Sequence, residues 1–85
     1  MMDFRLTGHA GRELVRRQIP QSVVEMVLAR PEQIVPEDAG RKAYQSKVEI
    51  HGKMFLIRAI VDDNVSPAVV VTVYRTSKIS KYWRT

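Results

Sequence analysis

A two-residue alternation of apolar and polar positions runs through the second half of the chain and predicts β-strands there. Three segments carry it: residues 44–50, 54–62 and 68–76. The third contains an unbroken β-branched stretch, Val69-Val70-Val71-Thr72-Val73, which is typical of a buried strand. Because consecutive strands usually lie side by side, we expect an antiparallel three-stranded meander.

The dipeptide His51-Gly52 predicts a two-residue hairpin turn between the first two strands. That turn places Val48 opposite Phe55. It also places Gln45 opposite Arg58, and a slip of one residue would bury charge. One face of the meander is then apolar: Phe55, Ile57, Ala59, Val69, Val71 and Val73. The reverse face is polar and basic: Lys47, Arg58, Thr72, Tyr74 and Thr76.

Apolar residues three and four positions apart predict two helices in the first third of the chain. The first is expected over residues 8–18, after Thr7, which can cap it. The second begins at Ser22, which stands three residues before Glu25 as in a capping box, and it ends before Pro31. We expect both helices to cover the apolar face of the meander.

Residues 31–43 hold two prolines, mixed charge and Gly40, which together predict a loop. The loop is long for a compact domain, which makes it a candidate for function. A short strand over residues 4–6 and a short final helix over about residues 77–82 complete the chain. We therefore predict an α+β fold of one domain, residues 1–85, in the order β-α-α-β-β-β, with an antiparallel sheet and two helices on one face.

The composition, with 45% hydrophobic and 27% charged residues, is that of a globular protein and not of a disordered chain. The absence of cysteine excludes disulfides and thiolate ligands. The two histidines lie far apart and the carboxylates are scattered, so we expect neither a metal site nor a cofactor. The chain has no apolar signal core and no apolar run that could cross a bilayer, so we expect a cytoplasmic protein without a membrane partner.

Positive charge is concentrated near the end of the chain. The net charge of +5 and the pI of about 10.0 favour an acidic partner such as nucleic acid. Residues 64–85 contain no Asp or Glu. They contain four cations with aromatic residues between them: Arg75, Lys78, Lys81 and Arg84, with Tyr74, Tyr82 and Trp83. Such a cluster at the end of a strand can hold phosphates and stack on bases, and a solvated basic tail is the alternative.

Metal-free cleavage of RNA is compatible with these residues, because the ribose 2′-OH supplies the nucleophile. Arg58 would stabilise the pentavalent phosphorane, or it is a surface arginine that pairs with Glu49 or with a carboxylate of a helix. His9 would transfer protons near neutral pH, or it bonds to Glu13 at the start of its helix. Tyr74 would donate a proton or stack on a base, or it serves only cross-strand packing.

Further residues are expected to contact the RNA. Lys78 and Lys81 would bind phosphate and share the catalytic charge stabilisation with Arg58. Four others are expected to bind RNA: Lys47, Arg75, Tyr82 and Arg12. His9 belongs to a helix expected on the side of the sheet opposite Arg58. Both can reach one substrate only if the start of that helix overhangs the edge of the sheet.

Three motifs lie at the start of the first helix, after the second helix and at the end of the last strand. They are Thr7-Gly8-His9-Ala10 with Arg12, Pro31-Glu32, and Val71-Thr72-Val73-Tyr74-Arg75-Thr76-Ser77-Lys78 leading into Lys81-Tyr82-Trp83. Together they resemble a small bacterial family known as domain of unknown function 4258, which is grouped by similarity with RelE/BrnT-like toxins. By position, Arg58 corresponds to the strand arginine of these toxins and His9 to the histidine of the helix-opening motif. Four residues correspond to their basic and aromatic C-terminal residues: Arg75, Lys78, Lys81 and Tyr82.

The resemblance implies a RelE-like topology and an RNA endonuclease that is the toxin half of a toxin–antitoxin pair. The expected function is therefore metal-independent cleavage of mRNA, either free or on the ribosome, and the expected partner is an acidic antitoxin. The alternative is a non-catalytic module of the same fold that binds RNA or an acidic protein. Self-association stays open.

Overall fold

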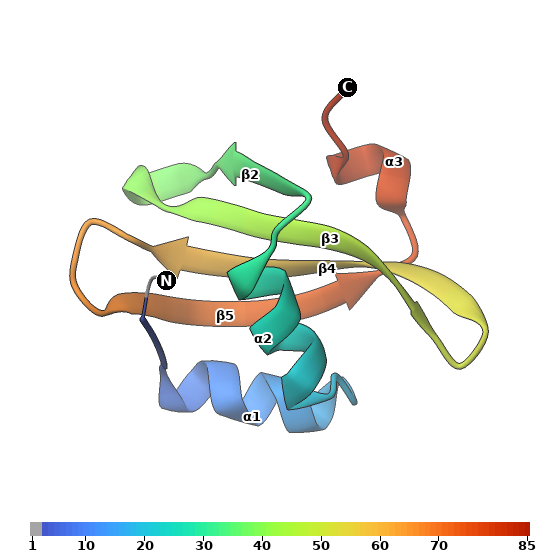
Figure 1. Ribbon diagram of the computed structural model, residues 1–85, viewed down its shortest axis with the longest axis horizontal. Helices are drawn as coiled ribbons and strands as arrows, with labels where there is room; N and C mark the ends of the chain where they lie inside the picture. Colours follow the sequence, from blue (N-terminus) through green and yellow to red (C-terminus); the bar gives the residue numbers. More distant parts are fainter. Residues whose placement is uncertain (1–2) are drawn as a thin grey trace.

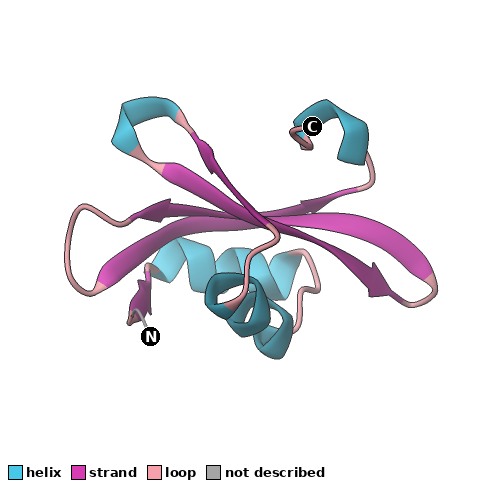
Figure 2. Cartoon of the chain, turned by 45° about the horizontal axis from the view of Figure 1, so that its top comes forward, coloured by secondary structure: helices cyan, strands magenta, loops and turns pink. Residues whose placement is uncertain are grey.

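The computed structural model describes residues 3–85 and shows a five-stranded mixed sheet (Figures 1 and 2). The strands, in the sheet order β1-β5-β4-β3-β2, are β1 (Phe4–Leu6), β5 (Ala68–Thr76), β4 (Lys53–Asp62), β3 (Lys42–Ile50) and β2 (Gln33–Pro36). The helices are α1 (Gly8–Arg16), α2 (Gln21–Ala29), the 3₁₀ turn η1 (Asp38–Gly40) and the short α3 (Ile79–Tyr82). Figure 2 shows α1 and α2 on one side of the sheet and the C-terminal helix on the other. The predicted α+β class and the short final helix are confirmed.

The side of the sheet that faces α1 and α2, here the helix face, forms the core together with these helices. α1 packs mainly on β5, and α2 packs on β3 and β4. The helices bury Ala10, Leu14, Val24, Val27 and Leu28, and the sheet buries Tyr44, Ile57, Ala59, Val61, Val70 and Val73. Within residues 3–85, no helix is long and apolar enough to cross a membrane.

The two helices begin differently from each other. Thr7 caps α1 as predicted, because its hydroxyl oxygen accepts a hydrogen bond from the backbone N–H of Ala10 at 3.0 Å. α2 begins at Gln21, one residue before the predicted cap, and its start has no side-chain capping bond. Ser22 therefore lies inside the first turn, and the predicted capping box is wrong.

The hairpin of β3 and β4 has the predicted register. Val48 pairs with Phe55, and Gln45 pairs with Arg58. In the turn, His51 and Gly52 have φ angles of 51° and 78°, both in the left-handed region. Two consecutive left-handed residues match the twist of the strands that they join, so this turn fixes the register of the β3–β4 hairpin.

A β-bulge at Val71 changes the pairing of β5 with β4. Val73 lies opposite Ala59, but Val71 has no partner residue, and the alternation of side chains is inverted before it. Val70 is therefore buried, whereas Val69 and Val71 are partly exposed. The prediction that Val69 and Val71 face the core is wrong, because a uniform β-branched run carries no signal for the position of a bulge.

Two further parts of the sheet differ from the prediction. β1 pairs with β5 in parallel, so the sheet is mixed and not antiparallel throughout. The segment predicted as a loop contains β2, which pairs with β3 at the edge of the sheet, and η1. The prolines that predict a loop are tolerated here, because Pro36 ends an edge strand, where a missing N–H costs no ladder bond.

We predict that Gly52→Ala lowers the free energy of unfolding by about 1 kcal/mol, because alanine is strained at a φ of 78°. There is open space where the new methyl group would lie, so the effect comes from the backbone alone. Gly11→Ala is the matched control. It also adds a methyl group in open space, but within α1, and should stabilise the protein by about 0.5–1 kcal/mol. Urea unfolding should show that the two variants change the free energy of unfolding in opposite directions. Equal changes would contradict the strain at the turn.

Candidate functional site

Arg58 lies in the middle of β4, on the face of the sheet opposite α1 and α2, which we call the reverse face. The residue is only 3% exposed, so the predicted open position on this face is wrong. The ring of Tyr82, in α3, lies 4.4 Å from the guanidinium carbon, and Glu37, just before η1, also contacts the guanidinium. The segments that cover this part of the sheet, around Glu37 and Tyr82, lie outside the predicted three-stranded meander.

The guanidinium of Arg58 is hydrogen-bonded through each of its nitrogens. Nε donates to Oε1 of Gln45 at 2.8 Å, and Nη2 donates to Oε2 of Glu37 at 3.2 Å. Nη1 donates to the hydroxyl of Tyr74. A buried charge is tolerated only when it is paired in this way. The counterion is therefore Glu37 and not Glu49, the carboxylate that the sequence suggested.

Cations and aromatic rings alternate across the reverse face. The guanidinium carbon of Arg17 lies 5.9 Å from the centroid of the Tyr74 ring, and that of Arg58 lies 5.7 Å from the same centroid. The Tyr82 ring lies over Arg58 and also 5.2 Å from Nζ of Lys81. We call these five residues the cation–aromatic row: Arg17, Tyr74, Arg58, Tyr82 and Lys81. Rings and cations in this order can bind bases and phosphates alternately.

The start of α1 overhangs the edge of the sheet. β1 pairs only with the first residues of β5, and α1 lies along the strand (Figure 1). Nε2 of His9 lies 3.2 Å from Oγ1 of Thr72, a reverse-face residue of β5. The geometric condition for His9 is therefore met, because His9 reaches the reverse face beside Tyr74, two residues further along β5.

Thr7 holds α1 in this position. Its hydroxyl donates a hydrogen bond to the carbonyl of Val71 at 3.0 Å, and its backbone N–H donates to the carbonyl of Val70 at 3.1 Å. Val71 is the bulge residue, so the irregular part of β5 provides the attachment for the helix. The bulge thus determines where His9 lies.

Glu13, on the buried side of α1, contacts three basic side chains spread along this helix: His9, Arg16 and Arg17. Its carboxylate accepts a hydrogen bond from Nε of Arg16 at 2.7 Å. The same carboxylate lies 3.6 Å from Nη2 of Arg17 and 4.0 Å from Nε2 of His9. The Arg16 hydrogen bond lowers the pKa of Glu13 below its ordinary value, although burial opposes this. Glu13 therefore remains ionised, and it holds His9 near Thr72 and Arg17 near Tyr74.

Tyr74 joins the two halves of the site, since it contacts both Arg58 and Arg17. Burial raises the pKa of its phenol above the ordinary value, and the hydrogen bond from Arg58 acts in the opposite direction. The net shift is upward, so Tyr74 keeps its proton at neutral pH. It can serve as a proton donor but not as a base.

The remaining predicted residues lie on both sides of the sheet. Lys47 is on the reverse face, where its Nζ lies 3.9 Å from the centroid of the Trp83 ring. Arg75 lies on the helix face, over Phe55 at 4.7 Å, because neighbours along a strand point to opposite sides. Arg75 therefore cannot share a site with Arg58. Two other cations are exposed and lie outside the cation–aromatic row: Arg12 and Lys78.

Four polar residues near Arg58 were not predicted from the sequence: Glu37, Gln45, Arg17, and Gln33, whose Oε1 accepts a hydrogen bond from Nε2 of Gln45 at 2.7 Å. The signal for Gln45 is the predicted register, which already places it opposite Arg58. Glu37 lies in the segment predicted as a loop, where no periodicity indicates the direction of a side chain. Arg17 follows α1, and its position depends on how the helix overhangs the sheet.

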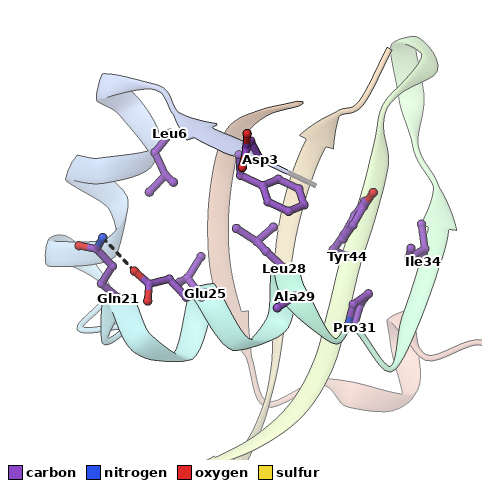
Figure 3. A pocket seen from close by; sticks show the side chains of 11 residues that line it. Asp3, Leu6, Gln21, Glu25, Leu28, Ala29, Pro31, Ile34 and Tyr44 are labelled. Atoms are coloured by element: carbon purple, nitrogen blue, oxygen red, sulfur yellow. Dashed lines mark hydrogen bonds between the residues drawn. The ribbon is translucent and has the colours of Figure 1, made fainter. Parts of the chain in front are cut away.

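A concave surface lies on the helix face (Figure 3). This groove, of about 620 Å³, lies between α2, β1 and the outer strands, and its lining is mainly apolar, with Leu28, Ile34 and Tyr44 among the residues. Glu25 and Asp3 are its acidic groups. None of the predicted site residues lines this groove, so it is separate from the cation–aromatic row.

The model of a family described as "Domain of unknown function (DUF4258)" matches residues 6–75 of the chain. Because the match spans most of the sequence, the chain belongs to this family. No curated protein and no solved structure matches the chain. The matched region contains His9, Arg58 and Tyr74, and it ends before Lys81 and Tyr82.

We predict that Glu13→Gln destabilises the protein at pH 7 and that the difference disappears in acid. A carboxyl group with a lowered folded pKa contributes stability above its unfolded value of about 4.3, and loses it as the pH falls through the folded value. Urea unfolding of both proteins between pH 3 and pH 7 measures this. Arg16→Gln should show the same pH dependence. A difference in the free energy of unfolding between wild type and Glu13→Gln that persists at pH 3 would contradict the ion pair.

Proposed function

We propose that this protein is a metal-independent endoribonuclease, the RelE/BrnT-like toxin of a toxin–antitoxin pair, which acts on mRNA in the cytoplasm. The observation that carries the proposal is the cation–aromatic row on the reverse face. Phosphates need fixed cations, and unpaired bases need flat rings or guanidinium planes, and the row offers both side by side. The family resemblance supports the choice of RNA, and the net charge of +5 supports a polyanionic partner.

Arg58 is the residue best placed to stabilise the phosphorane. An entering phosphodiester would replace Glu37 as its counterion, so the guanidinium would stay paired throughout. Glu37 is suited to this exchange because its side chain is 32% exposed, whereas that of Arg58 is 4% exposed. Lys81, at the end of the row, would bind the neighbouring phosphate.

His9 and Tyr74 would move the protons. Thr72, the partner of His9, and Tyr74 are two residues apart on β5, which corresponds to about 7 Å along the strand. In the cleavage step the 2′-oxygen forms a bond to phosphorus and the bond from phosphorus to the 5′-oxygen breaks. His9 would accept the proton of the 2′-OH, and the phenol of Tyr74 would give its proton to the 5′-oxygen. The products are a 2′,3′-cyclic phosphate and a free 5′-OH.

A non-catalytic RNA-binding module is the second candidate. The observation that favours it is the complete pairing of Arg58, which gives this residue a structural reason to be where it is. In either case the expected protein partner is an acidic antitoxin, whose carboxylates would take the place of phosphates on the reverse face. Such a chain could pair with the exposed edge of β2.

We expect the pure protein to cleave single-stranded RNA in the presence of EDTA and to leave an oligonucleotide with a 2′-deoxy group at the cleavage position intact. His9→Ala should slow cleavage by about 100-fold, since it removes a proton acceptor at an exposed position. Arg58→Lys should slow it by about 100-fold or more, because lysine cannot form the same fork.

The matched control is Arg30→Ala, which removes one exposed cation at the end of α2, away from the reverse face. It should leave the cleavage rate unchanged. Thermal melting shows whether each variant is folded. Equal cleavage by the wild type and by folded His9→Ala and Arg58→Lys variants would reject these roles.

Salt dependence separates binding from cleavage. We expect the association constant for single-stranded RNA, measured by fluorescence anisotropy, to fall steeply with salt because counterions are released from phosphates. Lys81→Ala should make the logarithmic slope shallower by about 0.7, the value for one phosphate contact. An unchanged slope would remove Lys81 from the interface. Salt-sensitive binding without any cleavage would leave the binding module as the function.

A further inference from the structure

The end of the chain lies across the reverse face and is held by four side chains of the sheet, which we call the cradle: Gln33, Gln45, Lys47 and Arg58. The amide of Gln33 pairs with the backbone of Arg84, since Oε1 accepts from its N–H at 3.1 Å and Nε2 donates to its carbonyl. Nε2 of Gln45 donates to the carbonyl of Tyr82 at 3.2 Å. Two side-chain amides thus bind the planar groups of a passing chain.

The same segment places two consecutive rings on two cations. The Tyr82 ring lies 4.4 Å from the guanidinium carbon of Arg58. The Trp83 ring lies 3.9 Å from Nζ of Lys47. The cradle therefore holds residues 82–84 through ring stacking on cations and through amide hydrogen bonds, in alternation.

These contacts are the ones that unpaired nucleotides make with proteins. A base offers a flat ring for a guanidinium or an ammonium group, and its edge carries a carbonyl or amino group that pairs with a glutamine amide. The segment is also weakly attached, because α3 has no buried residue and residues 84 and 85 are exposed. Parts of a protein with few buried contacts open at low cost in free energy.

We propose that the cradle is a binding surface for two consecutive unpaired bases of single-stranded RNA, and that residues 82–84 occupy it when RNA is absent. The choice of RNA rests on the proposed function, and the inference adds which residues receive the bases. RNA binding then requires the C-terminal segment to leave. Its departure lifts the Tyr82 ring off Arg58 and opens the guanidinium to phosphate, and it leaves Tyr82 and Lys81 free to contact the RNA from outside the cradle. The observed affinity is reduced by the fraction of molecules in which the cradle is already filled.

Trp83→Ala tests the proposal, because the loss of this ring is predicted to raise the affinity for RNA. Loss of an aromatic residue that stacks on RNA lowers affinity, whereas loss of a ring that blocks the cradle raises it. We expect Trp83→Ala to bind a short single-stranded 2′-O-methyl oligoadenylate at least about threefold more tightly than the wild type. Lys47→Ala, which alters the cradle itself, should bind at least about threefold more weakly. Fluorescence anisotropy measures both.

Two further measurements keep the result interpretable if Trp83→Ala is unstable. Arg84→Pro removes the N–H that Gln33 accepts and should also tighten binding, although it deletes a cation. Trp83 is the single tryptophan of the chain, so its emission should shift to the red when the oligoadenylate displaces it from Lys47. Weaker or unchanged binding by both variants, or an emission that does not shift in a bound complex, would overturn the proposal.

The 2′-O-methyl probe cannot be cleaved, so binding and cleavage are judged separately. Cleavage of unmodified RNA without the gain in affinity would leave the proposed function intact and reject the cradle. The gain in affinity without cleavage would support the cradle and reject the ribonuclease. Absence of binding to any single-stranded RNA would reject both.

Discussion

A buried guanidinium must keep a partner for each of its nitrogens, and Arg58 imposes this condition on the reverse face. Its partners come from three places in the chain: Gln45 in β3, Tyr74 in β5 and Glu37 before η1. Tyr82 in α3 closes over it. Loss of one charged partner within a protein costs several kcal/mol, so these distant segments are tied to a single side chain. Because β4 is the central strand of the sheet, these segments all meet in the middle of the reverse face.

The two faces of the sheet have separate roles, because successive side chains of β4 point to opposite faces. Ile57 and Ala59, on either side of Arg58 in β4, face the helices and belong to the core. Arg58 faces the other way, where the C-terminal segment and η1 provide polar cover. The bulge at Val71 then connects the two faces, because Thr7 attaches α1 to it and brings His9 around the edge of the sheet.

The parts of the fold that depend on short-range sequence patterns could be predicted. His51-Gly52 fixes the hairpin, so the pairing of Gln45 with Arg58 could be predicted to the residue. The overhang of α1 could be stated only as a requirement for His9 and Arg58 to reach the same substrate. The bulge, β2 and the burial of Arg58 could not be predicted. A uniform β-branched run carries no signal for the bulge, and the prolines of residues 31–43 predict a loop where β2 pairs with β3. The burial of Arg58 depends on a segment far along the chain. Tyr82 is twenty-four positions from Arg58, and no periodicity indicates that a short helix folds back over the strand.

The central claim is that the reverse face is the surface that meets RNA. Nitrogen-15 NMR tests it most directly, by titration of the labelled protein with a single-stranded 2′-O-methyl RNA. The Nε–H signal of Arg58 and the amide signals of Lys47, Thr72 and Tyr74 should shift together, and those of α2 should not. Shifts confined to α2 and to the apolar groove beside Ile34, with the Arg58 signal unmoved, would contradict it.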